Sequence, residues 1–271
     1  MKTRIISAVV LLPLLLAALL FAPEWVTAAI VAVSCAIAAY ELLFNTGIVR
    51  HVRLIAYSMI MAALVPLWCY WGRSYAWGLI GLLVFCAVLF GEMMASHVKL
   101  RFEKVIACFV GGILIPFLFA STVRVHNMSE GRYYIILVLV LTFLPDSGAY
   151  FAGRFFGKHK LAPVISPKKT VEGAIGAVLV AMVGVVLYSL ALSIFFDFKV
   201  NYGYAVIYGI AGSLADIFGD LCFSVIKRQT GIKDYGRLIP GHGGILDRFD
   251  SMILVGPLTE ALLLLIPLAV Y

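Results

Sequence analysis

Carboxylates, serines and a lysine recur at helical spacing along the apolar run 202–223 and just beyond it. The polar positions are Ser213, Asp216, Asp220, Ser224 and Lys227. Steps of three and four residues place all of them on one helix face. Two carboxylates one turn apart repel each other unless a cation or a proton lies between them. Serine alone would account for interhelical hydrogen bonding, so the two acids at membrane depth indicate a functional site.

The polar link 224–250 combines glycines, cations and further acids. Glycines such as Gly243 and Gly244 let backbone N–H groups approach an anion closely. Asp247 and Asp250 are one helical turn apart and offer the hard oxygen ligands that Mg²⁺ prefers. Arginine and lysine suit phosphate oxygens. A solvated loop that only sets topology would explain the cations, but not Gly-His-Gly-Gly followed by Asp-Arg-x-Asp.

The other long link, 154–172, contains the run Ser-Pro-Lys-Lys-Thr-Val-Glu-Gly at 166–173. We expect Ser166 to cap a helix that has Pro167 at its first position. Lys168, Lys169 and the free N–H groups of that helix start would then favour an anion. The alternative is a basic cap that faces lipid phosphates.

Spanning helices must position these residues. Of the 271 residues, 63% are hydrophobic and only 13% are charged, whereas a soluble domain has about 25% charged residues. The runs are continuously apolar, without the alternation of a β-barrel. We expect an all-α polytopic integral membrane protein with about nine spans of about 20 residues each. The runs are roughly 5–22, 25–44, 54–72, 76–95, 105–123, 133–153, 173–196, 202–223 and 251–270.

The distribution of Lys and Arg predicts the orientation. With the N-terminus in the cytoplasm, nearly all of the 21 basic residues fall in cytoplasmic segments, as the positive-inside rule requires. The four exceptions are Arg73, Arg124, Arg132 and Lys199. The C-terminus should then lie outside. The first run is longer than the apolar core of a signal peptide, so we interpret it as a retained span.

Asp146 and Asp216 reach similar depths, about 20 Å from the outer ends of their spans at 1.5 Å per residue. We therefore expect the acids to gather near the cytoplasmic side. We divide the chain into N-terminal spans, 1–132, and a C-terminal catalytic membrane region, 133–271, with cytoplasmic links 154–172 and 224–250. The net charge of +7 then reflects topology, anionic lipid heads and phosphate handling, with no nucleic acid as a partner.

The second link resembles the signature of the phosphatidate cytidylyltransferase (CDP-diacylglycerol synthase) family. That signature runs Ser-x-apolar-Lys-Arg, then Lys-Asp, a small residue, Pro or Gly, His-Gly-Gly and Asp-Arg-x-Asp. The residues that match it are Ser224, Lys227, Arg228, Lys233, Asp234, Gly236, Pro240, His242, Gly243, Gly244, Asp247, Arg248 and Asp250. The run at 166–173 is also similar to the family. The first four or five spans resemble it only in hydropathy and length.

The resemblance implies that CTP and phosphatidic acid react to give CDP-diacylglycerol and pyrophosphate, in phospholipid biosynthesis. It also implies Mg²⁺ dependence, with the metal held by Asp220 and Asp247 and with K⁺ as a second ion that the site would accept. Asp146, Asp216 and Asp250 are further metal-ligand candidates. With the orientation above, the active site faces the cytoplasm, in what we expect to be a bacterial inner membrane.

Residue roles follow from this reaction. We expect a catalytic set of Asp220, Asp247, Asp250, Lys227 and His242. We expect a substrate-binding set of Lys168, Lys169, Ser224, Arg228, Lys233, Asp234, Arg237, Gly243, Gly244 and Arg248. His242 is a positioning donor in this interpretation rather than a general base, because a phosphate nucleophile is already an oxyanion.

Two other activities are compatible with parts of the pattern. A CTP-dependent lipid kinase of the polyprenol type would transfer the γ-phosphoryl group and release CDP. A cation-coupled transporter would use the acid stripe, but that predicts acids at the midplane with broken helices around them. A phosphatidyl-group transferase would need an Asp-Gly-x-x-Ala-Arg type run, and the sequence has none.

Several residues outside the motifs receive weaker expectations. Glu41 and Glu92 lie near cytoplasmic span ends, where water is within reach. Glu260 is equally compatible with interhelical bonding and with function. The isolated histidines are expected to be solvated: His51, His97, His126 and His159. Small residues favour close helix packing within one chain or in a homodimer: Gly148, Ala149, Gly153 and Gly157.

Overall fold

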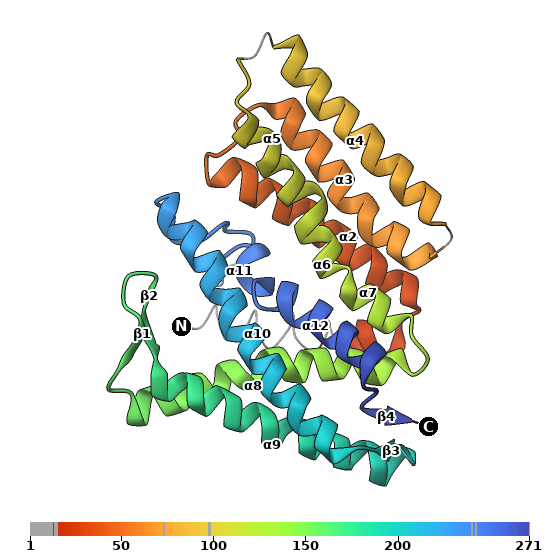
Figure 1. The fold of residues 1–271 in the computed structure, drawn as a ribbon, viewed down its shortest axis with the longest axis vertical. Helices are drawn as coiled ribbons and strands as arrows, with labels where there is room; N and C mark the ends of the chain where they lie inside the picture. Colours follow the sequence, from red (N-terminus) through yellow and green to blue (C-terminus); the bar gives the residue numbers. More distant parts are fainter. Residues whose placement is uncertain are drawn as a thin grey trace. The chain divides into compact units, whose positions relative to one another are not determined.

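The computed structural model describes residue 13 and residues 16–72, 74–96, 99–239, 241 and 243–270. Within these residues, seven helical segments are long and apolar enough to cross a membrane. They are α2 with its terminal π-helical turn (Glu24–Asn45), α3 (Val52–Trp71), α4 (Tyr75–Ala95), the interrupted helix α5–α7 (Phe102–His126), α8 (Gly131–Phe156), α9 (Val171–Phe196) and α10 (Tyr202–Gln229) (Figure 1). Each overlaps an expected run, so the all-α membrane architecture is confirmed.

The first and last of the expected apolar runs are not among these seven helices. Run 5–22 lies largely outside the described residues. The last run, expected over 251–270, contains the 14-residue helix α12 (Met252–Leu265). At 1.5 Å per residue such a helix is about 21 Å long, shorter than a hydrocarbon core of about 30 Å. The total of nine spans and the side of each terminus therefore stay predictions.

The remaining elements are short. Helix α11 covers Leu246–Phe249. Strand β1 (Lys160–Ala162) pairs antiparallel with β2 (Ser166–Thr170), and β3 (Lys199–Val200) pairs antiparallel with β4 (Ala269–Val270). The interrupted span consists of α5 (Phe102–Phe109), a π-helical turn (Val110–Leu114), α6 (Ile115–Phe119) and α7 (Ser121–His126).

Contacts divide the chain into two compact units. Unit 1 contains Met1–Ser129 and Gln229–Phe249, and unit 2 contains Glu130–Arg228 and Asp250–Tyr271. The first change of unit falls close to the boundary expected after residue 132. The link residues 229–249, which the sequence grouped with the C-terminal region, instead make their contacts with the N-terminal helices.

In unit 1, α2 packs along α3, and a hydrophobic cluster joins α3, α4 and α5. Phe85 and Phe109 meet edge to face there, with ring centroids 5.4 Å apart. His126 is buried in α7, and its Nδ1 lies 2.9 Å from Thr27 Oγ1. The expectation of a solvated loop histidine was therefore wrong for His126.

In unit 2, α8 and α9 pack through small residues. A Cβ added to Gly148 would lie 2.7 Å from the backbone oxygen of Gly176 and 2.8 Å from Val180 Cβ. A Cβ on Gly173 would lie 2.9 Å from the backbone oxygen of Ala149. Such close backbone approach is typical of small-residue interfaces in membranes. The expected close packing therefore occurs within one chain, and a homodimer stays a prediction.

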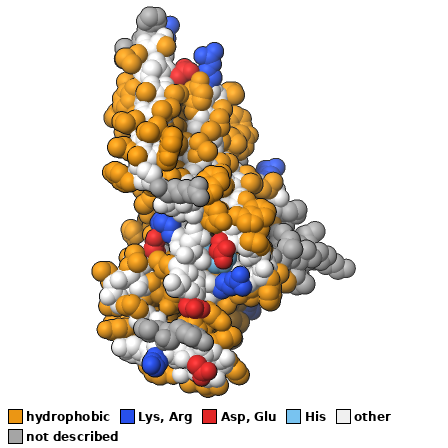
Figure 2. All heavy atoms as spheres, turned by 90° about the vertical axis from the view of Figure 1, so that its right-hand side faces the viewer, with side chains coloured by type: hydrophobic (Ala, Val, Ile, Leu, Met, Phe, Trp, Pro, Cys, Tyr) orange, Lys and Arg blue, Asp and Glu red, His pale blue; other side chains and the backbone are white. Residues whose placement is uncertain are grey.

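The surface agrees with a membrane environment. Figure 2 shows a face on which hydrophobic side chains cover large areas, with charged groups at several places between them. Large apolar side chains on α4 and α9 are highly exposed, for example Trp77 at 68%, Val183 at 59% and Leu187 at 58%. A soluble monomer rarely exposes extended apolar patches of this kind, so these helices suit lipid contact.

The α8–α9 interface gives a direct test. We expect Gly148→Ala to lower the free energy of unfolding by about 1–3 kcal/mol, because overpacking forces neighbouring atoms to move. Gly91→Ala in α4 is the matched control, because no atom lies within 4 Å of its added Cβ. The control should be neutral or stabilising, since alanine forms helices better than glycine. Thermal unfolding in detergent compares the two variants, and equal stability would contradict the interface.

Candidate functional site

The polar stripe of α10 is present as the sequence predicted. The helix is continuous from Tyr202 to Gln229, so the five polar positions share one face. Ser213, Asp216 and Ser224 are buried. The Ser224 hydroxyl donates to Asp220 Oδ1 at 3.1 Å, which links two positions of the stripe.

Lys169 provides the positive charge next to this stripe. Its Nζ lies 2.5 Å from Asp220 Oδ2, an ion pair that both side chains make while partly shielded from solvent. Lys169 stands in strand β2, which the β1–β2 pairing holds in place. The Arg228 side chain donates through Nε to the backbone oxygen of Ile165 at 3.0 Å, which fastens the end of α10 to this hairpin.

The expected helix cap at Ser166 was wrong. Residues Ser166–Thr170 form strand β2, and helix α9 begins at Val171. Thr170 is the N-cap, because its hydroxyl accepts a hydrogen bond from the Gly173 backbone N–H at 3.1 Å. The β1–β2 ladder uses the backbone of Ser-Pro-Lys-Lys-Thr, so this run presents its lysines from a strand rather than from a helix start.

Asp216 is the most deeply buried acid of the stripe, at 2% exposed. Within the part of the chain that the structure describes, its Oδ1 has no hydrogen-bond partner. Asp146 on α8, Asp220 and Lys169 all interact with it electrostatically. A buried carboxylate oxygen without a donor is costly, and such exceptions in native structures call for a cation, a proton or an unseen ligand.

Asp250 and Ser251 extend the acidic cluster within unit 2. The Ser251 hydroxyl donates to the backbone oxygen of Asp216 at 3.1 Å. A Cβ on Gly219 would lie 3.0 Å from Ser251 Cα, so the glycine permits this close approach. Burial, reinforced by the charge of Asp220, raises the pKa of Asp250 to about 7, although Lys227 acts in the opposite direction. Several carboxylates thus compete for few positive charges.

The link 229–249 has its own organisation in unit 1. Asp247 is 7% exposed, and its Oδ2 accepts hydrogen bonds from the backbone N–H groups of Tyr235 at 2.7 Å and Gly244 at 3.0 Å. Gly243 has φ of +91°, and a Cβ there would lie 2.8 Å from the same oxygen. One oxygen of Asp247 therefore joins two separate parts of the link backbone, at Tyr235 and at Gly244. A metal role for Asp247 stays a prediction.

Glu41 is the residue that the sequence interpretation missed. It was expected near water, but it is 2% exposed. Its Oε1 accepts from the Ile245 N–H at 3.1 Å and its Oε2 from the Leu246 N–H at 2.8 Å. The only signal in the sequence was an acid inside an apolar run, since its partners lie about 200 residues further along the chain.

The other expected site residues are mostly exposed. This group contains Lys168, Arg228, Lys233, Asp234, Arg237 and Arg248. Exposed cations are available to phosphates, but nothing in their surroundings tests that role. Lys227 is half-buried on α10. Pro240 and His242 lie outside the described residues, so the positioning role of His242 stays a prediction.

The predicted Mg²⁺ site stays a prediction, although unit 2 contains oxygen ligands of the right type. Carboxylate oxygens of Asp216, Asp220 and Asp250 are the ligand type that Mg²⁺ takes, and Asp216 Oδ1 has no donor among the described residues. Over that same part of the chain, no three His, Cys, Asp or Glu side chains stand together as a ready-made metal site. Lys169 supplies the positive charge beside Asp220 in this arrangement.

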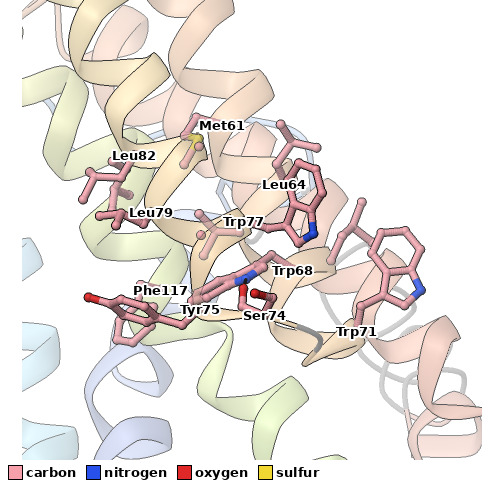
Figure 3. Close-up of a pocket in the computed structure, with 15 residues that line it drawn as sticks. Met61, Leu64, Trp68, Trp71, Ser74, Tyr75, Trp77, Leu79, Leu82 and Phe117 are labelled. Carbon is pink, nitrogen blue, oxygen red and sulfur yellow. Dashed lines mark hydrogen bonds between the residues drawn. The ribbon is translucent and has the colours of Figure 1, made fainter.

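A large pocket elsewhere in unit 1 has the opposite chemistry. It has a volume of about 540 Å³ and is walled by α3, α4 and Phe117 (Figure 3). Trp68 and Trp77 contribute indole faces, and Trp68 Nε1 donates to the Ser74 backbone oxygen at 3.2 Å. The remaining walls are aliphatic or aromatic. This lining suits hydrocarbon and not a nucleotide phosphate.

The fold and the polar cluster together define a class. The chain is a polytopic α-helical membrane protein whose spanning helix α10 carries a lysine-paired carboxylate stripe. The cytidylyltransferase family model matches residues 2–266, so the chain belongs to the cytidylyltransferase family.

Relatives of the chain carry a more specific name. Proteins named phosphatidate cytidylyltransferase are similar to it in three staphylococci. Identity is 46% over 139 residues for Staphylococcus saprophyticus, covering 51% of this chain and 52% of the relative. It is 39% over 186 residues for Staphylococcus epidermidis, covering 68% of each. It is 43% over 174 residues for Staphylococcus aureus strain COL, covering 61% of this chain and 62% of the relative. The chain thus spans between about half and two thirds of these relatives.

The unpartnered oxygen of Asp216 leads to a stability test. We expect Asp216→Asn to raise the free energy of unfolding by about 1–3 kcal/mol in metal-free detergent, because it removes a buried charge close to other carboxylates. Asp197→Asn is the control. Asp197 is exposed, with φ of 56°, a conformation that asparagine tolerates. Thermal unfolding measures both, and a less stable Asp216→Asn protein would contradict the argument.

Proposed function

We propose that this protein is a phosphatidate cytidylyltransferase, which converts CTP and phosphatidic acid into CDP-diacylglycerol and pyrophosphate. The observation that carries the proposal is the cytidylyltransferase family match over residues 2–266. The printed name of the staphylococcal relatives supports the choice of phosphatidic acid as the second substrate. Family membership favours neither the lipid kinase nor the cation-coupled transporter.

The reaction is a single displacement at phosphorus. A phosphate oxygen of phosphatidic acid attacks the α-phosphorus of CTP, the new O–P bond forms, and the bond from that phosphorus to the bridging oxygen breaks. The leaving group is pyrophosphate. Because the nucleophile is already an oxyanion, catalysis rests on alignment and on neutralising phosphate charge. A strong general base is not required.

Cations on both links would neutralise the phosphates. Lys169 lies beside the stripe, where its Nζ pairs with Asp220, and Lys168 lies next to it on β2. The exposed cations of α10 and the second link would extend this set: Arg228, Lys233, Arg237 and Arg248.

The resemblance to the family implies Mg²⁺, with K⁺ as a second ion, held by Asp220 and Asp247. These residues would hold a cation that, when bound, would offset negative charge on the transferring phosphate. Asp216 and Asp250 supply carboxylates of the right chemistry within unit 2, and Asp146 lies within their electrostatic range. The pairing of Asp220 with Asp247 on one cation rests on the resemblance alone.

Hydrophobic helices and bacterial relatives support a membrane location. We propose that the protein lies in a bacterial inner membrane with the site facing the cytoplasm, where CTP is available. The bias of basic residues toward the links 154–172 and 224–250 supports this orientation. The proposal also leaves room for a homodimer.

The activity test uses purified protein, labelled CTP, phosphatidic acid and Mg²⁺. We expect labelled CDP-diacylglycerol and one pyrophosphate per turnover. Release of CDP with a phosphorylated lipid would instead identify a kinase. Product formation that needs no phosphatidic acid would contradict the lipid substrate.

Substitutions then test the acids separately. We expect Asp220→Asn and Asp247→Asn each to lower kcat at least about 100-fold, because each would lose a carboxylate that is proposed to hold Mg²⁺. Glu103→Gln is the control, since Glu103 forms an exposed pair with Arg101 at 2.8 Å, and such pairs contribute little. Folding is checked by gel filtration and thermal unfolding. Near wild-type activity in either variant would remove that acid from the mechanism.

A further inference from the structure

The carboxylate of Glu41 holds the backbone of the glycine-rich link. Glu41 is the first residue of the π-helical turn Glu41–Asn45 that ends the first described spanning segment. Its two oxygens accept hydrogen bonds from two consecutive N–H groups, those of Ile245 and Leu246. These residues immediately precede Asp247, so the contact fixes the backbone that carries a proposed catalytic acid.

The glycines of the link are shaped around this carboxylate. A Cβ placed on Gly236 or on Gly244 would overlap the Glu41 carboxylate oxygens. Neither glycine has a positive φ, so backbone conformation does not explain why these positions lack a side chain. The space that a Cβ would need is occupied by Glu41. Two glycines of the link therefore serve as the walls of a carboxylate pocket.

Two other side chains complete the same arrangement. Asp247 Oδ2 accepts from the N–H groups of Tyr235 and Gly244, and Asn45 Nδ2 donates to the Tyr235 backbone oxygen at 2.6 Å. Three consecutive N–H groups, from residue 244 to residue 246, are thus bonded to two carboxylates. All of these residues belong to unit 1, and most of them are buried.

We propose that Glu41 is a positioning residue for the cytidylyl transfer. It touches no substrate in this proposal, which rests on the function proposed above. Its role is to hold the link so that Asp247 and the cations around it have one fixed geometry. Hydrogen bonds in a low-dielectric interior are stronger than in water, and small misplacements of catalytic groups cost large factors in rate.

Glu41→Gln is the most specific test of these hydrogen bonds. Glu41→Gln keeps the side-chain length but turns one of the two acceptors into an N–H₂ donor, which then faces a backbone N–H. The link should loosen without a change in packing volume. Glu92→Gln is the matched control, because Glu92 is another acid on an apolar helix of unit 1, with the same oxygen 3.2 Å from the Tyr57 hydroxyl and 3.7 Å from Arg53.

The first measurement is backbone hydrogen exchange on the full chain in detergent. We expect peptides covering residues 243–247 to exchange about tenfold faster or more in Glu41→Gln, with the rest of unit 1 unchanged and with Glu92→Gln like wild type. Exchange within about twofold of wild type in these peptides would overturn the proposal. This readout needs no turnover, so it stands even if the proposed reaction is wrong.

The second measurement is steady-state kinetics. We expect kcat/KM of Glu41→Gln to fall about 10- to 100-fold, with KM rising at least about threefold for CTP or for phosphatidic acid. A smaller folded fraction alone would lower kcat and leave both KM values unchanged. Faster exchange with wild-type kinetics would overturn the positioning role. Absence of turnover in the wild-type protein would contradict the proposed function instead.

Gly236→Ala approaches the same contact from the other side, and it tests the proposal if Glu41→Gln does not fold. The added Cβ should displace the Glu41 carboxylate and produce the same exchange and kinetic changes. In the double variant Glu41→Ala with Gly236→Ala, the two effects should overlap rather than multiply, because each removes the same contact. Multiplicative effects would mean that the glycine and the glutamate act independently.

Discussion

The local structure of this protein depends on how each carboxylate is compensated in an apolar surrounding. Without water, an unpaired charge or an unbonded polar atom is costly. Glu41 is compensated by backbone N–H groups, and Asp220 is compensated by Lys169 and Ser224. Asp216 Oδ1 has no hydrogen-bond donor among the described residues. Protein groups therefore compensate both oxygens of Glu41, whereas among the described residues one oxygen of Asp216 has no donor.

Compensating a buried carboxylate with backbone N–H groups also requires glycine. A carboxylate can accept hydrogen bonds from backbone only where the backbone comes very near, and Gly236 and Gly244 permit that approach around Glu41. Gly219 likewise lets the segment at Ser251 pack against α10. The glycines of the signature are therefore required by protein contacts as well as by any phosphate. A glycine-rich link does not by itself indicate which backbone N–H groups remain for an anion.

Hydropathy was sufficient for the seven membrane-length helices of the described residues, because each is a continuous apolar run and lipid leaves few alternatives to a helix. Periodicity was sufficient for the stripe of α10, since positions at steps of three and four share a face in any unbroken helix. The prediction at Ser166 was wrong for a local reason. A Ser-Pro pair is a good helix start, but the same residues can pair with Lys160–Ala162, and that ladder prevailed.

Glu41 and His126 could not be predicted because their environments are set by distant residues. Nothing near Glu41 in the sequence points to Ile245 and Leu246, and nothing near His126 points to Thr27. For such residues, proximity to a span end is an unreliable guide. An acid in an apolar run carries a better signal, since insertion without a partner would be costly. The identity of the partner still has to come from the structure.

The division into units groups most of the signature-bearing link, residues 229–249, with the N-terminal helices. The chain changes unit between Arg228 and Gln229 and again between Phe249 and Asp250. Arg228, before the link, bonds to the β1–β2 hairpin, and α12, after the link, contacts α8. The link itself is held by Glu41 and Asn45. The first half of the chain contributes no signature residue, yet it determines the conformation of the segment that contains Asp247. Substitutions in the π-helical turn Glu41–Asn45 that follows α2 should therefore lower the rate of the proposed transfer without changing any residue of the signature.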